Sequence, residues 1–213
     1  MKQYKITQRD TYIYLIKENI DLVKSLVDYA KKHPLAFDPN NIEPLYRSRA
    51  KHLQTMAISG LTCEHLIKLI VLKRGYSINE VDYIKNPDTK PKIQYADKTI
   101  SFGKAIKLFN DSNPDPNNYF NDVGVYEFNN GDIDYEYSYL GYKKIDPKTC
   151  ISLIQRIRNN YIHQVNSYSE WNGIIWYVYD FIIWLAKKEF SSHFSQYEYI
   201  GNDEIKSLFK DEK

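Results

Sequence analysis

The side chains best suited to chemistry in this chain fall in one short window, residues 156–163. Arg156, Arg158, Asn159 and His163 lie there, inside a stretch whose apolar periodicity predicts a helix. An arginine is always charged and can hold a phosphate through two hydrogen bonds, whereas a histidine can transfer a proton near neutral pH. Together they are suited to cleaving a phosphodiester without a metal ion.

The helical repeat places these residues on two faces of the predicted helix. At about 100° per residue, Arg156, Asn159 and His163 share the polar face, where Asn159 can orient the imidazole one turn later. Arg158 lies on the flank of the apolar face, where a charge is costly unless it meets an acid or a wet cleft. Glu64, alone on an apolar helix surface, is a candidate acid. Arg158 is the preferred phosphate contact because Asn159 follows it directly, and Arg156 is the alternative.

An all-α chain is expected to position this window. Apolar residues recur at spacings of three and four, which predicts helices over residues 11–32, 45–74, 101–109, 147–168 and 170–190. Gly60 suggests a bend in the second helix, and the basic pair before Gly75 marks its end. A capping-box pattern that starts at Ser77 suggests a further short helix. The sequence therefore predicts one domain over residues 1–213, an antiparallel helical bundle with a C-terminal tail at 191–213.

Residues 111–142 interrupt the helical pattern. Alternating apolar and polar residues flank an Asn- and Gly-rich turn at 129–132, which predicts a β-hairpin inserted near 123–140. The segment is rich in tyrosine and holds seven acidic residues but no Lys or Arg, so the rest of the chain carries 29 basic residues and 27 minus 7, or 20, acidic ones. This distribution fits a polyanion partner together with a segment that repels or mimics it, and it equally fits an ordinary solvated surface.

The composition argues against several other classes of protein. Cys63 and Cys150 lie in apolar helical runs without CxxC spacing, which predicts buried, reduced thiols in a cytoplasmic protein. Residues 1–10 are too polar for a signal peptide, and the apolar run at 174–186 is too short to span a bilayer. The sequence has no HExxH motif and no glycine-rich phosphate loop. We therefore expect no metal ion, no cofactor and no membrane.

The window resembles the signature of the HEPN superfamily, an arginine followed by a polar residue, with four to six residues between that arginine and a histidine. Arg158, Asn159 and His163 fit it with four intervening residues. The stretch 59–75, in the second predicted helix and its end, is similar to the second helix of these domains, and the resemblance covers most of residues 11–190. One toxin subgroup has a tyrosine two positions after the histidine, where this chain has Val165. Regulation through modification of such a tyrosine is therefore not expected.

The resemblance implies a metal-independent endoribonuclease of a bacterial toxin–antitoxin or abortive-infection system, such as an abortive-infection protein resembling the AbiV group. Such proteins act on RNA, usually as homodimers that bring two motifs into one cleft, and an antitoxin or inhibitor protein is a further partner. By this resemblance His163 would transfer protons, Arg158 would stabilise charge on the phosphate, and Asn159 would orient the histidine or touch the phosphate. Glu64 and Arg156 would support them.

Other interpretations remain open at the level of sequence. The same fold could be a non-catalytic module that binds RNA, a nucleotide or a partner protein in a defence complex. The acidic hairpin could instead capture a partner, with the motif merely structural. Arg158 would then form an ion pair between helices, and His163 would be a solvated surface residue.

Overall fold

The computed structural model describes residues 8–32, 41, 43–79, 99–121, 147–163 and 174–200. Within them the chain forms helices and an isolated antiparallel bridge between Asn79 and Thr99, but no strand. The helices are α1 (Gln8–Lys32), α2 (Glu43–Lys73), α3 (Phe102–Asp111), α5 (Pro147–His163) and α6 (Ile174–Phe194). The predicted all-α fold is thereby confirmed. The hairpin predicted near 123–140 lies outside the described residues.

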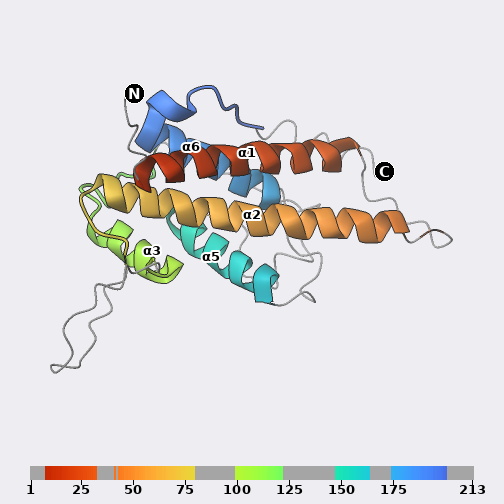
Figure 1. The fold of residues 1–213 in the computed structure, drawn as a ribbon, viewed down its shortest axis with the longest axis horizontal. Helices are drawn as coiled ribbons and strands as arrows, with labels where there is room; N and C mark the ends of the chain where they lie inside the picture. The colour runs from red at the N-terminus through yellow and green to blue at the C-terminus, as the bar shows by residue number, and fades with distance from the viewer. Residues whose placement is uncertain are drawn as a thin grey trace, which may run out of the picture.

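Helix α2 is the centre of the arrangement, because it contacts α1, α3, α5 and α6. Figure 1 shows α1 and α2 side by side and running in opposite directions, with α3 and α5 along the other side of α2. The apolar stripe predicted for the first helix faces the core; its buried members are Ile13, Ile16, Ile20, Val23 and Val27. Burial of such stripes is the main force that holds helices together.

The ends of α2 and α3 follow from local sequence. Gly75 has a φ of +87°, in the left-handed region that favours glycine, and its amide donates to the Leu72 carbonyl. Ser101 caps α3 by accepting a hydrogen bond from the Lys104 amide. The short helix expected from Ser77 is wrong at its start, because the chain there is extended: the Ile100 amide donates to the Ile78 carbonyl at 2.8 Å.

Two features expected of a core are present. Cys63 and Cys150 are free and fully buried, as predicted, and burial raises the pKa of the Cys63 thiol. The stretch Leu53–Lys73 of α2 is long and apolar enough to cross a membrane, but 72% of its apolar window is buried inside the protein. That burial is what a helix at the centre of a bundle requires.

Residues 191–194, predicted to belong to the tail, form the end of α6 after non-helical backbone angles at Phe190.

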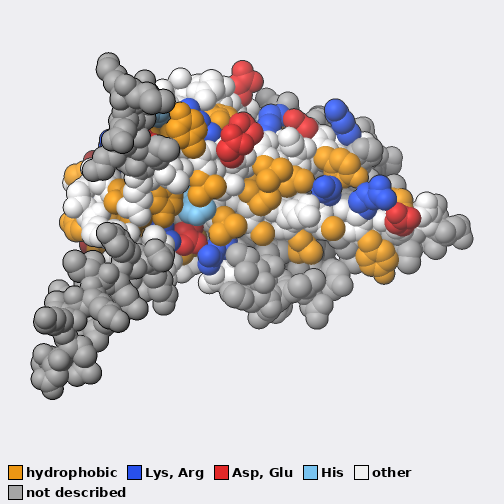
Figure 2. All heavy atoms as spheres, viewed as in Figure 1, with side chains coloured by type: hydrophobic (Ala, Val, Ile, Leu, Met, Phe, Trp, Pro, Cys, Tyr) orange, Lys and Arg blue, Asp and Glu red, His pale blue; other side chains and the backbone are white. Residues whose placement is uncertain are grey.

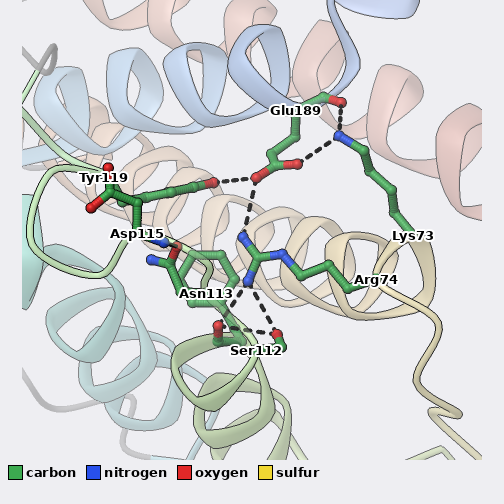
Figure 3. Close-up of polar contacts among 8 residues, drawn as sticks. Lys73, Arg74, Ser112, Asn113, Asp115, Tyr119 and Glu189 are labelled. Carbon is green, nitrogen blue, oxygen red and sulfur yellow. Dashed lines mark hydrogen bonds and ion pairs between the residues drawn. The ribbon is translucent and has the colours of Figure 1, made fainter.

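A polar network around Glu189 ties α6 to the end of α2 (Figure 3). Its carboxylate accepts hydrogen bonds from Tyr119 Oη at 2.6 Å and from Lys73 Nζ at 2.8 Å, and Arg74 Nη2 lies 3.3 Å away. Arg74 also donates to the Phe109 carbonyl at the end of α3. The network therefore joins α2, α3, the segment that follows α3, and α6.

Replacing Glu189 by glutamine is expected to lower the free energy of unfolding at pH 7 by about 2 kcal/mol, because Arg74 then loses its carboxylate. Burial alone would raise the pKa of Glu189, but hydrogen bonds from Lys73 and Tyr119 and the charge of Arg74 hold it below the ordinary value of 4.5. A lowered folded-state pKa means that this stabilisation is complete above pH 4.5 and is lost as the pH falls through the folded-state pKa.

Urea unfolding of wild type and Glu189→Gln at pH 7 and at acid pH measures the effect. Glu43→Gln is the control, because Glu43 is 75% exposed in its pair with Arg47 and its loss is expected to change little. The difference between wild type and Glu189→Gln should shrink at acid pH. An equal difference at both pH values would contradict the assignment.

Candidate functional site

The motif helix α5 meets α2 at a glycine. A Cβ atom added to Gly60 would lie 2.4 Å from Arg158 Cβ, 2.9 Å from its Cγ and 3.3 Å from its Cα. Only a residue without a side chain permits this approach of the two helices. Helix α2 runs unbroken through Gly60, so the contact with α5 explains the glycine, for which the sequence suggested a bend.

From this crossing Arg158 extends to Glu64, the acid that the sequence offered as its partner. Arg158 Nη2 lies 2.8 Å from Glu64 Oε2, and Nη1 donates a hydrogen bond of 3.1 Å to Asn159 Oδ1. The Glu64 side chain is 9% exposed and the Arg158 side chain 23%. The Arg158 side chain therefore lies at the edge of the core and is partly exposed to solvent.

The contact between Arg158 and Glu64 is an ion pair that leaves hydrogen-bonding capacity unused. Among the described residues, Glu64 Oε2 and Arg158 Nε have no hydrogen-bond partner, although both atoms are buried. Arginine–carboxylate pairs frequently form two parallel hydrogen bonds, and buried polar atoms without partners are costly. The pair thus leaves more of its hydrogen-bonding atoms without partners than is expected of a pair whose role is only structural.

Lys68 completes a charged cluster that the sequence analysis did not identify. Its Nζ donates to Glu64 Oε1 at 2.7 Å and to Thr99 Oγ1 at 2.9 Å. The side chain is only 6% exposed. Glu64 therefore joins two cations, and the cluster of Arg158, Glu64 and Lys68 carries one net positive charge. The available signal was the i, i+4 spacing of Glu64 and Lys68, which does not reveal their burial.

His65 borders this cluster on the side of α1. Its ring centroid is 5.5 Å from that of Tyr12, with the ring planes at 58°. Burial lowers the pKa of His65, and the charges of Lys68 and Arg158 act in the same direction against that of Glu64. The imidazole is therefore neutral at pH 7. Figure 2 shows a histidine at the surface over α2 with acidic and basic side chains beside it.

The exposed face of α5 carries the other predicted residues. Arg156 and Asn159 are exposed, whereas the opposite face is buried through Cys150, Leu153 and Ile154, as the helical wheel predicts. The backbone is helical as far as His163, which lies one turn beyond Asn159; the His163 side chain is outside the described residues. The structure thus brings Arg158, Asn159 and Glu64 together and leaves Arg156 on the exposed face.

Comparisons of the chain with models of protein families, with curated proteins and with solved structures find no match. The function is therefore argued from the residues of α2 and α5 and from their geometry.

Proposed function

We propose that this chain is a HEPN-type endoribonuclease that cleaves RNA without a metal ion. The observation that carries the proposal is the state of Arg158, which is partly exposed, adjoins Asn159, and keeps a buried Nε without a hydrogen-bond partner among the described residues. Helix α5 extends from this arginine to His163. The residue proposed to bind the anion and the residue proposed to transfer protons therefore belong to the same end of α5.

In the proposed reaction the 2′-hydroxyl of a ribose attacks the adjacent phosphorus. The new bond joins O2′ to phosphorus, and the bond from phosphorus to O5′ breaks. His163 takes the proton from O2′. A proton goes to O5′ either from a second, protonated His163 or from the first one, which now carries the proton of O2′. Arg158 stabilises the negative charge that grows on the phosphate oxygens. The products are a 2′,3′-cyclic phosphate and a 5′-hydroxyl.

The proposed assembly is a homodimer in which two α5 helices face each other. A twofold axis would place two copies of Arg158 and His163 around one RNA strand, so that one histidine acts as base and the other as acid. In a bacterial cytoplasm such an enzyme would need restraint, and an antitoxin or inhibitor protein would supply it. Defence against phage by abortive infection is the setting that we propose for this activity.

The test is to incubate the purified protein with total RNA and with a tRNA pool in the presence of EDTA and to map the product ends. We expect cleavage that EDTA does not reduce and ends that carry 2′,3′-cyclic phosphate. Cleavage that stops with EDTA and returns with a divalent metal would overturn the mechanism. RNA binding by a folded dimer without any cleavage would favour the non-catalytic binding module instead.

A further inference from the structure

Lys68 has no part in the proposed reaction, yet it is among the most buried charged residues that the structure describes. The residue is 4% exposed, on the central helix α2. Burying an ammonium group is costly even when it is paired, and apolar residues in place of both Lys68 and Glu64 would avoid that cost. Stability alone therefore does not explain why a lysine stands at this position.

The arrangement of Glu64 suggests a reason. One carboxylate oxygen, Oε1, accepts a hydrogen bond from Lys68, and the other, Oε2, lies against Arg158. Two cations thus share one anion. If Lys68 were neutral, Glu64 would cancel the charge of Arg158 entirely, and the pair would have no net attraction for a phosphate.

Because Glu64 and Lys68 are buried, the balance of charges among Lys68, Glu64 and Arg158 has a large effect. Charges interact more strongly in the interior of a protein than in water, and salt screens a buried pair much less than an exposed one. The Glu64 side chain is 9% exposed and that of Lys68 is 6% exposed, so solvent cannot compensate for a missing partner. Thr99 supplies a second contact that holds the ammonium in place, since its Oγ1 accepts from Lys68 Nζ at 2.9 Å.

We propose that Lys68 is a positioning residue of the RNA site. It neutralises Glu64, so that Glu64 does not cancel the positive charge of Arg158 and this charge stays available to a phosphodiester. This inference rests on the proposed function, in that Arg158 is taken to hold an RNA phosphate. Glu64 then orients the guanidinium, and Lys68 offsets the negative charge that Glu64 brings to the site. The site binds its ligand with one net positive charge.

A charge cycle tests the proposal in a non-cleaving His163→Ala background. Lys68→Met leaves the cluster neutral, Glu64→Gln leaves it with two positive charges, and the double variant restores one. Binding of a labelled single-stranded RNA is measured over a range of salt concentrations. One lost phosphate contact lowers the slope of log K against log salt by about 0.7 and weakens binding roughly tenfold.

We expect Lys68→Met to show both changes. The Glu64→Gln, Lys68→Met double variant should regain the parent's salt slope, with a weaker affinity than the parent because Glu64 no longer orients the guanidinium. Lys24→Met is the matched control, because Lys24 also forms an i, i+4 pair, with Asp28 at 2.8 Å, in which both side chains are 43% exposed. Its salt slope should equal that of the parent. A cluster with a structural role only would change the melting temperature and leave the salt slope unchanged.

Several outcomes are informative independently of the cleavage assay. Should Lys68→Met fail to fold, Lys68→Gln removes the same charge but keeps a polar side chain, and its slope should fall by about 0.7. In the Glu64→Gln background Lys68 has no carboxylate to neutralise, so its removal should leave the slope unchanged. Slopes that are equal across the cycle would overturn the role of Lys68 even if the wild type cleaves RNA. A slope that follows the cycle in a protein that never cleaves RNA would support Lys68 and refute the nuclease.

Discussion

Replacement of His163 by alanine is expected to lower the rate of RNA cleavage by about 10²- to 10⁴-fold, the range that a positioned acid or base contributes. If one histidine from each protomer acts, the variant loses both groups at once, since the dimer carries the substitution twice. RNA binding should persist, because Arg158 and its contacts with Glu64 and Asn159 remain. Initial cleavage rates in EDTA and the binding constant for RNA, measured on the same preparation, check both parts.

His193→Ala is the matched control for this experiment. His193 stands in the last turn of α6, another helix end of the same chain, and is neither fully exposed nor buried. Its replacement should leave the cleavage rate unchanged. Wild-type cleavage by a folded His163→Ala protein would remove His163 from the mechanism, and the loss of RNA binding together with cleavage would assign it to the fold or to binding rather than to proton transfer.

The parts of the fold that sequence could predict are those decided within a few residues of chain. Recurrence of apolar residues every three or four positions identified α1, because burial of one face is a property of the helix itself. The end of α2 was equally predictable, since a glycine that follows basic residues provides the left-handed residue that a helix end needs.

Tertiary partners decided the features that the sequence analysis missed. Ser77 matches a capping box, but the buried Ile78 pairs with the chain at Ile100 and keeps this segment extended. Gly60 suggested a bend because a glycine weakens a helix, whereas its function is to admit Arg158 from another helix. Both outcomes depend on residues far away in the sequence, which no local pattern specifies.

The candidate site likewise has one contact that the sequence predicted and others that only tertiary packing explains. The cost of a charge on an apolar flank indicated that Arg158 needs an acid, and the isolated position of Glu64 made it the best candidate; the structure pairs them at 2.8 Å. The contact of Lys68 with Thr99 spans 31 residues and the contact of His65 with Tyr12 joins two helices. Only the packing of α2 against its neighbours brings those groups together.

The second large effect is expected at Gly60, where alanine should destabilise the protein and reduce cleavage together. The added Cβ would lie 2.4 Å from Arg158 Cβ and 3.3 Å from its Cα, so that α2 and α5 must separate. Overpacking of this kind costs about 1–3 kcal/mol, against which alanine gains up to about 1 kcal/mol in helix propensity. We expect a net loss of about 1–2 kcal/mol in the free energy of unfolding.

Gly60→Ala is expected to raise the activation free energy of cleavage by more than it lowers the free energy of unfolding. Arg158 is the residue that the new methyl group meets, and displacement of a substrate-positioning group by about 1 Å can cost 10²-fold in rate. Separation of the helices would also loosen the contact with Glu64, which depends on the same crossing. Urea unfolding and initial cleavage rates of the folded variant, measured below the onset of unfolding, distinguish the two effects.

Gly103→Ala provides the control, because Gly103 is also a helical glycine that contacts α5. There an added Cβ would meet only Gln155 Nε2, at 3.1 Å, and the end of a flexible side chain can move aside at little cost. Gly103→Ala should therefore retain both stability and cleavage. If Gly60→Ala behaved in the same way, α2 and α5 would tolerate separation at their crossing, and the position of Arg158 against Glu64 could not be what the activity requires. Loss of cleavage in Gly60→Ala but not in Gly103→Ala would show that the activity depends on the crossing of α2 and α5 at Gly60. Of the two glycine contacts, this is the one that fixes Arg158.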